Sequence, residues 1–221
     1  MTKNKLKTYL ENYKVYFSSR EEDNERIYNT IIRLLKLNCF HTLERKKKIL
    51  DVGSGDKSFY KVCLKNDLDA YEIDGSEGIN FEKDKLPYQD NDFDFVLFNA
   101  VIEHLYSPDQ ILSEIYRILK KEGVLILITP NFKYAFRNFY NDPTHVHPYT
   151  PQSLKKILEM NKFNNNKIFP FLVNKHNFYW KVPFKFFLAS IIPFRNDSLK
   201  NFPFLNFLKG KSTSMISLSK K

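Results

Sequence analysis

The sequence predicts an α/β protein built on a doubly wound, mostly parallel sheet. Short apolar runs that suit strands buried on both faces alternate with amphipathic helical stretches, as expected of such a sheet. The first run, residues 49–52, leads into a turn that contains Gly53 and Gly55, and a helical stretch follows from Ser58. Strand, glycine turn and helix in this order form the opening of a nucleotide-type cofactor site.

The acidic residues around this turn bear on the kind of cofactor. The two glycines remove side chains where the backbone must turn and a ligand must approach closely. Asp51 and Asp56 flank the turn, so a pyrophosphate on the helix N-terminus would face two carboxylates. The dinucleotide pattern G-x-G-x-x-G would also need glycine in place of Ser58. A cofactor that carries cationic groups is therefore favoured.

The segment D-V-G-S-G, residues 51–55, resembles the first motif, [DE]-x-G-x-G, of class I S-adenosylmethionine-dependent methyltransferases. This cofactor carries an ammonium and a sulfonium and no phosphate, and the resemblance covers residues 47–164 well and 165–221 loosely. It implies a Rossmann-like, seven-stranded sheet with an antiparallel last strand, and methyl transfer by in-line displacement at the sulfonium. The family often has a third glycine where this chain has Lys57, which we expect to point to solvent. The residues implied to hold the methionyl end are Asp51, Gly53, Ser54 and Gly55.

An acidic residue ends the second predicted strand, residues 70–74. Asp74 lies 21 positions after Gly53, a spacing at which an acid can accept both ribose hydroxyls of an adenosine cofactor. The D-G-S that includes Gly75 resembles the family's D-x-S at this point. Glu72 is the alternative ribose acceptor, and an ordinary strand-end carboxylate is the alternative to any binding role.

The stretch before the next strand is short. Residues 86–94 resemble the L-P-[FY]-x-D-x-x-F-D linker of small-molecule methyltransferases. We therefore expect the helix that usually precedes this linker to be missing or reduced to a turn. Phe81 and Glu82 are the candidates for adenine contacts, one packing on the ring and the other accepting the exocyclic amine.

A hydrophobic strand over residues 93–98 ends at the segment N-A-V-I-E-H, which resembles a family motif. Ligands bind beyond the carboxyl ends of parallel strands, which places this segment beside the transferred methyl. Glu103 is a candidate catalytic residue. Some ubiquinone-pathway relatives bind a divalent metal through Glu-x-x-Glu-His, but Ala100 replaces the first Glu, so we predict no required metal. The candidate cofactor contacts here are Asn99, Ala100, Val101 and His104.

Two histidines lie in a proline-framed loop, residues 141–151. Its D-P-T-H-x-x-P-[YF]-T pattern resembles methyltransferases of surface-polysaccharide and glycolipid pathways. A histidine of ordinary pKa suits a general base toward a hydroxyl, so His145 and His147 are candidates for base or substrate orienter. The alternative is that His145 braces the loop and His147 hydrogen-bonds backbone.

Four helices are predicted from apolar spacing and end signals. The first covers residues 22–40 and either gates the site or covers a sheet edge. The second starts at Ser58, with Phe59, Val62, Cys63 and Leu64 on its inner side. A capping box at 107–110 starts the third, which runs to Lys121 and ends at Gly123, and Thr150-Pro151 starts the fourth.

The C-terminal part departs from a minimal domain of this family. Residues 167–173 suit the sixth strand and 214–218 the seventh, and between them an insertion mixes phenylalanines with lysines and prolines. It could dock on a membrane, form a lid or dimer contact, or bind nucleic acid. We divide the chain into an N-terminal helical cap, the methyltransferase domain and the insertion, with bounds 1–46, 47–175 with 213–221, and 176–212.

Charge and composition limit the kinds of partner that the protein can bind. The net charge of +10 divides into +6 for residues 1–50, −5 for 51–164 and +9 for 165–221. Basic ends favour membrane headgroups or nucleic acid, although AT-rich coding alone could produce the same bias. Two cysteines make no disulfide framework, and no apolar run is of spanning length. Because the first residues are polar and basic, we expect no signal peptide. We expect a cytoplasmic protein that can touch the inner face of the membrane.

These observations predict an S-adenosylmethionine-dependent methyltransferase that O-methylates a sugar, a lipid-linked glycan or another small molecule. An RNA methyltransferase that uses the basic ends is an alternative, although the phenylalanine-rich insertion makes nucleic acid the less favoured partner. A non-catalytic scaffold of the same fold is a further alternative. The carboxylates at the turn oppose a dehydrogenase. The oligomeric state is left open.

Overall fold

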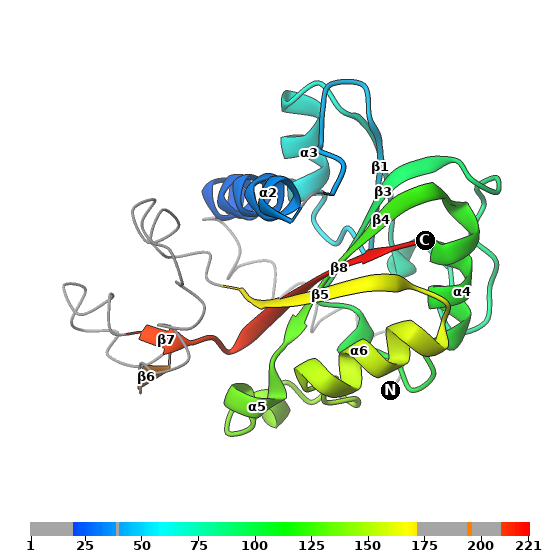
Figure 1. The fold of residues 1–221 in the computed structure, drawn as a ribbon. Helices are drawn as coiled ribbons and strands as arrows, with labels where there is room; N and C mark the ends of the chain where they lie inside the picture. Colours follow the sequence, from blue (N-terminus) through cyan, green and yellow to red (C-terminus); the bar gives the residue numbers. More distant parts are fainter. Residues whose placement is uncertain (1–19, 39, 172–193, 196–208) are drawn as a thin grey trace.

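The computed structural model of the chain describes residues 20–38, 40–171, 194–195 and 209–221. Its centre is a six-stranded sheet in the order β2-β1-β3-β4-β8-β5 (Figure 1). The strands of this sheet are β1 (Lys48–Val52), β2 (Asp69–Ile73), β3 (Phe93–Asn99), β4 (Leu119–Pro130), β5 (Asn164–Pro170) and β8 (Ser214–Lys220). A separate parallel pair consists of β6 (Phe194–Arg195) and β7 (Lys209–Lys211).

Strand directions agree with the predicted fold class. The strands β1, β2, β3 and β4 run parallel, and β8 is antiparallel to both of its neighbours, β4 and β5. The predicted count of seven strands is not confirmed, since the main sheet has six in the part of the chain that the structure describes. Between Ile73 and Phe93 the chain forms only a short 3-10 helix, η1 (Gly75–Glu77). A parallel crossover needs a dozen or more residues, so this stretch has no room for a further strand and its two connections.

Helices cover both faces of the sheet (Figure 1). One face carries α2 and α3, and the other carries α4 and α6. Alternate residues of β4 show the division, because Ile126 packs toward α2 and α3 while Leu125 and Leu127 pack toward α4. The helices are α2 (Arg20–Leu37), α3 (Ser58–Lys65), α4 (Asp109–Ile118), α5 (Phe132–Ala135) and α6 (Pro151–Met160), with 3-10 turns at η2 (Ile102–His104) and η3 (Phe139–Asn141).

The first helix packs on the sheet face beside α3, rather than along a sheet edge. Its apolar stripe is confirmed at Ile31, Leu34 and Leu35, which are fully buried. Leu37, the last residue of the helix, is by contrast 56% exposed. Leu64 of α3 is likewise exposed, whereas the other inner residues predicted for α3 are buried.

The third predicted helix differs most from expectation. The helix α4 stops at Ile118, and Gly123 lies inside β4. A Cβ at Gly123 would lie 2.8 Å from the Lys120 carbonyl oxygen, and Glu122 has a φ of 63°. The glycine therefore serves a close backbone approach within the strand and not a helix C-cap. The predicted capping box at the start of this helix is also absent, because the N-cap residue Pro108 makes no side-chain cap bond.

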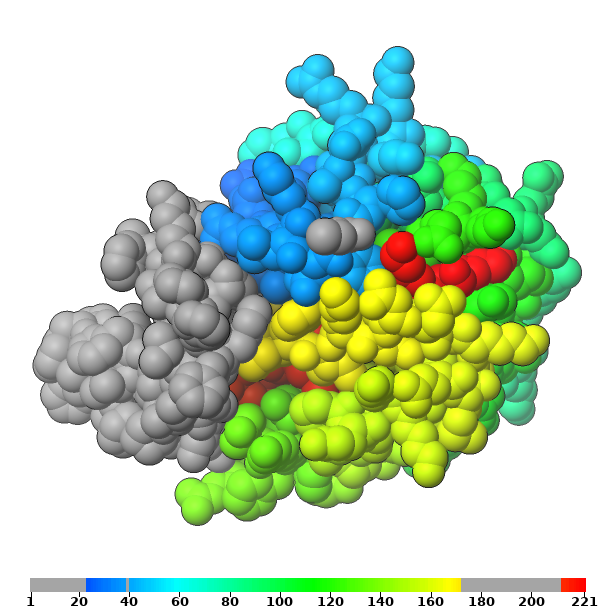
Figure 2. Space-filling view, in the orientation of Figure 1, coloured from blue at the N-terminus to red at the C-terminus, as the bar shows by residue number. Residues whose placement is uncertain are grey.

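The fourth helix confirms its predicted start. Thr150 caps α6 in a reciprocal capping box with Ser153, with Pro151 in the first turn. Figure 2 shows α6 and β5 (yellow) on the surface of the molecule, next to the blue segment that holds α2. β5 begins three residues before the predicted start at Lys167.

Most of the predicted insertion lies outside the described residues, as do residues 1–19 of the predicted cap. The division of the chain into cap, domain and insertion therefore stays a prediction. Among the described helices, none is both long and apolar enough to cross a membrane.

Candidate active site

The carboxyl ends of the parallel strands bring the predicted site residues to one rim of the sheet. The turn after β1 meets the segment after β3 directly. Gly53 has a φ of 78°, and a Cβ placed there would lie 2.3 Å from Cγ2 of Val101. Its amide donates to the Ile73 carbonyl at the end of β2, at 2.8 Å. The glycine turn is therefore held between the two neighbouring strand ends, as the predicted cofactor site requires.

Four acidic side chains gather at this turn. Asp51 is only 5% exposed, and burial together with the nearby Glu72, Asp74 and Asp56 raises its pKa to about 7. Each of these carboxylates disfavours ionisation of the others, and a cation among them relieves the repulsion. This electrostatic environment fits the ammonium and sulfonium of S-adenosylmethionine and opposes a phosphate.

The two candidate ribose acids have different partners. Asp74 accepts hydrogen bonds from the amides of Gly55 at 2.9 Å and Ser76 at 2.8 Å. Although burial raises the pKa of Asp74, these bonds hold it below its usual value. A carboxylate has about four acceptor positions, so Asp74 keeps capacity for ribose hydroxyls. Glu72 instead accepts from the Ser54 hydroxyl at 2.6 Å and pairs with Lys57.

The Lys57 side chain is 41% exposed, as expected of a residue near solvent, but it also pairs with two carboxylates, which the sequence did not predict. It stands at a φ of 60°, and its ammonium pairs with Glu72 and, at 3.0 Å, with Glu77. The excess of carboxylates at the turn attracts the cation back over the site. Lys57 thereby pairs with Glu72 and also helps to lower the pKa of Asp74, whereas neither Asp51 nor Asp74 forms an ion pair in the described part of the chain.

The candidate adenine contacts lie on the short connection that follows η1. Phe81 is buried, and its ring would lie 3.7 Å from a Cβ placed at Gly75. It therefore sits next to the predicted ribose acid. Glu82 accepts a hydrogen bond from the Ser107 amide at 2.7 Å, which ties this connection to the segment after η2. The adenine roles of both residues stay predictions.

The segment after β3 turns sharply toward the helix η2. Ala100 has a φ of 53°, in the left-handed region, and its amide donates to the Ile128 carbonyl of β4 at 2.9 Å. Glu103 follows and is 1% exposed, with its carboxylate accepting from the Thr129 hydroxyl at 3.0 Å. Burial raises the pKa of Glu103 to about 7. The segment therefore presents a nearly buried acid behind the predicted methyl position.

The histidine loop is anchored on η2. The Glu103 carbonyl accepts from the amides of Val146 at 2.9 Å and His147 at 3.0 Å. These bonds bring His145 over His104, with ring centroids 4.8 Å apart. The ring of His147 instead stacks on Tyr149 at 4.6 Å and is exposed. Of the two loop histidines, His145 alone enters the site.

Glu103, His104 and His145 form one cluster. One carboxylate oxygen and one nitrogen from each ring lie within 4.8 Å of one another. Burial and the neighbouring His145 lower the pKa of His104, so this imidazole is neutral near pH 7. Sequence reasoning named all three residues but did not place them together, because His145 lies far along the chain. It missed Thr129, although a polar residue after the apolar run 124–128 is a usable signal.

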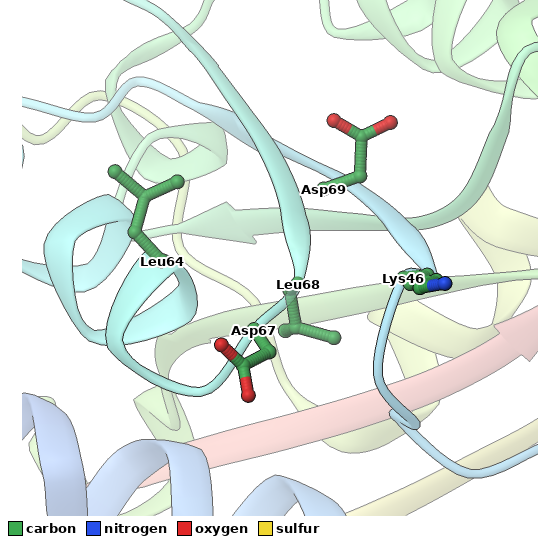
Figure 3. A pocket seen from close by; sticks show the side chains of 5 residues that line it. All are labelled: Lys46, Leu64, Asp67, Leu68 and Asp69. Carbon is green, nitrogen blue, oxygen red and sulfur yellow. The ribbon is translucent and has the colours of Figure 1, made fainter.

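A surface pocket lies at the opposite end of the sheet from the predicted site. Figure 3 shows its lining at the start of β2, between Lys46, Asp67 and Asp69. This is the end of β2 opposite to Asp74. The pocket is therefore separate from the rim that carries the predicted site.

A glycine-turn cofactor site on a mostly parallel sheet with one antiparallel strand defines the class of S-adenosylmethionine-dependent methyltransferases. A profile of a family described as a methyltransferase domain matches residues 20–168. The chain belongs to this family. The family, the enzyme class and the cofactor predicted from the sequence are thereby confirmed.

The chain is also similar to individual proteins. An uncharacterized protein of Methanocaldococcus jannaschii is 29% identical over 127 residues, which span 54% of this chain and 58% of that protein. A probable S-adenosylmethionine-dependent methyltransferase of Mycolicibacterium smegmatis is 35% identical over 78 residues, 34% of this chain and 30% of its own length. The crystal structure of a SAM-dependent methyltransferase from Archaeoglobus fulgidus has the same fold, with a TM-score of 0.61, 21% identity and coverage of 95% and 99%.

Proposed function

We propose that the protein transfers the methyl group of S-adenosylmethionine to a hydroxyl oxygen of a sugar, a lipid-linked glycan or a similar small molecule. The observation that carries this proposal is the cluster of Glu103, His104 and His145 beside the cofactor rim. Imidazole and carboxylate groups suit the orientation and deprotonation of a hydroxyl. The D-P-T-H-x-x-P-Y-T loop, with its resemblance to enzymes of polysaccharide and glycolipid pathways, supports the acceptor class.

On this proposal, different residues at the rim bind different parts of the cofactor. Asp51 and the turn at 53–55 hold the methionyl end, and Asp74 holds the ribose. Phe81 packs on the adenine, Glu82 accepts its amine, and residues 99–101 form the floor beneath the methyl. The close packing of the Val101 side chain against Gly53 supports this arrangement, because it holds residues 99–101 next to the glycine turn.

The reaction breaks the sulfur–methyl bond as the new oxygen–methyl bond forms. The products are S-adenosylhomocysteine and a methyl ether, and the hydroxyl proton leaves to the cluster or to solvent. Catalysis then depends mainly on holding donor and acceptor in line. Removal of the acceptor proton during or after attack is the second contribution.

The test is a methyl-transfer assay with radiolabelled S-adenosylmethionine and the lipid, glycan and RNA fractions of a host extract. We expect label in the glycan or lipid-linked glycan fraction. Label in RNA alone would favour the nucleic-acid alternative. Stabilisation by S-adenosylhomocysteine without label in any fraction would favour a non-catalytic scaffold.

The composition of the insertion supports a peripheral contact with anionic membrane as part of this proposal. Residues 176–212 interleave phenylalanines with lysines, a composition typical of interfacial segments. Such a contact would bring the site to a lipid-linked acceptor. Co-sedimentation with anionic vesicles, and its loss with neutral vesicles or at high salt, is the expected result.

A further inference from the structure

We infer that Glu103, His104 and His145 bind one divalent first-row transition-metal ion, with the carboxylate and the two Nε2 atoms as ligands. The starting observation is their convergence, since one carboxylate oxygen and one nitrogen from each imidazole lie within 4.8 Å of one another. Two of the three ligands come from η2 and the third from the loop anchored on it. This inference revises the expectation that no metal is required, which considered Glu103 and His104 without a third ligand.

The hydrogen bonds of the imidazoles determine which nitrogen is available. Nδ1 of His145 lies 2.7 Å from the Phe139 carbonyl oxygen, which can only accept, so Nδ1 carries the proton. Nδ1 of His104 lies 3.2 Å from the Thr144 carbonyl oxygen and 2.9 Å from the Thr144 hydroxyl. That hydroxyl donates its own proton to Asp142 at 2.6 Å, so it accepts from His104. With the proton on Nδ1, each ring has its lone pair on Nε2, and Nε2 of His145 lies 3.9 Å from Oδ2 of Asp142.

This arrangement is the one that metal-binding histidines use. A ligand histidine typically donates its second ring N–H to a backbone carbonyl or a carboxylate-linked group, which fixes the tautomer and the ring direction. His145 donates to a carbonyl directly, and His104 donates to Thr144, which Asp142 orients through both its amide and its hydroxyl. Both rings are thus oriented before any ion binds.

The charge at the cluster also calls for a cation. Glu103 is 1% exposed, and its carboxylate accepts a hydrogen bond from the neutral Thr129 hydroxyl. No lysine or arginine pairs with it within residues 20–38, 40–171 and 209–221. A buried carboxylate without a counter-ion is costly, and a divalent cation between it and the two imidazoles supplies that counter-ion.

The ligand set selects the kind of ion. Two imidazoles and one carboxylate suit zinc, cobalt, manganese or iron, whereas magnesium and calcium prefer oxygen ligands alone. Three protein ligands leave a coordination position open for water or substrate. A hydroxyl bound there would lose its proton more easily. This last role rests on the proposed function, whereas metal binding itself does not.

The test titrates the full chain, after removal of metal with a chelator, with Co²⁺, Zn²⁺ and Mg²⁺ in separate experiments. Neither cofactor nor acceptor is present, so failure of the methyl-transfer assay and failure of metal binding are distinguishable. We expect calorimetry to give one Co²⁺ or Zn²⁺ per chain and about 100-fold weaker binding of Mg²⁺. The visible absorption of bound Co²⁺ reports nitrogen ligation.

Variants locate the site. We expect His145→Ala and Glu103→Gln each to weaken Co²⁺ binding by about 100-fold or more, as removal of a ligand exceeds the effect of an outer-shell change. The matched control is His147→Ala, which removes an imidazole from the same loop outside the cluster and should keep full affinity. His104→Gln replaces Glu103→Gln if loss of the Thr129 bond prevents folding. Absence of a one-to-one complex, or equal loss in His147→Ala, overturns the inference.

Discussion

The backbone of Gly53 and the side chain of Val101 occupy adjoining space, so the turn after β1 and the end of β3 fit only when position 53 has no Cβ. A Cβ there would lie 2.3 Å from Cγ2 of Val101. At Gly55, which also has a positive φ, no atom lies within 4 Å of such a Cβ. The two glycines of the motif are therefore required for different reasons.

Gly53→Ala should destabilise the protein more than Gly55→Ala. Both changes strain a left-handed backbone, at about 1–2 kcal/mol, but only Gly53→Ala also overpacks against Val101, for about 1–3 kcal/mol more. Denaturant unfolding of the two variants measures the difference. The double variant with Val101→Ala should recover part of the loss. Equal costs for the two glycines would contradict the close contact.

Asp74→Ala should weaken binding of S-adenosylhomocysteine by tenfold or more, because it removes the carboxylate that we propose accepts charge-assisted hydrogen bonds from the ribose. Isothermal titration measures the affinity. Glu72→Gln is the matched comparison, because Glu72 lies two residues before Asp74. Because Asp74 also accepts the Gly55 and Ser76 amides, unfolding of each variant must be measured alongside. Unchanged affinity in Asp74→Ala would move the ribose role to Glu72.

The class of the sheet and the order of its main elements could be predicted from the sequence, because both depend on local patterns. Apolar runs gave the strands, and Thr150-Pro151 gave the start of α6. The end of α4 could not be predicted in the same way. Gly123 carries the signal of a helix C-cap, yet its actual constraint is a carbonyl of Lys120 that only the folded strand brings near.

The site was predictable as separate residues but not as an arrangement. The sequence predicts a solvent-facing Lys57, whereas the fold places Glu72 of β2 beside it and the two side chains form an ion pair. From the sequence, His145 is an isolated histidine in a loop. In the fold, the Glu103 carbonyl accepts hydrogen bonds from the amides of Val146 and His147, which brings His145 to the site. Both contacts join segments far apart in the sequence, and no local pattern encodes such a distance.

The protein should lose stability as the pH rises from about 4 to about 7, in part through Asp51. Its pKa is raised from 3.8 in the unfolded chain to about 7 in the folded protein. Below both values the carboxyl is protonated in either state and contributes nothing. Between them only the unfolded chain releases the proton, and each tenfold change in proton affinity corresponds to about 1.4 kcal/mol. The full cost is present above the folded pKa.

Asp51→Asn tests this assignment. The variant should be more stable than the natural protein at pH 8 and should show little difference at pH 4, as thermal unfolding at both pH values measures. Its affinity for S-adenosylhomocysteine should fall, because the carboxylate that we propose faces the cationic end of the cofactor is lost. A stability difference that does not change with pH would show that Asp51 does not titrate in this range.

His145→Ala should lower the rate of methyl transfer strongly while leaving cofactor affinity intact. His145 contacts Phe139 and His104 and lies outside the acidic turn that the cofactor is proposed to occupy. Turnover is measured with the acceptor fraction that takes up label, and cofactor affinity by the rise in melting temperature with S-adenosylhomocysteine. Phe139→Leu is a useful companion, because it alters the ring that packs on His145 at 4.6 Å but keeps the backbone carbonyl that holds Nδ1. A normal rate in His145→Ala would make the imidazole a brace for the loop and move acceptor activation to another group.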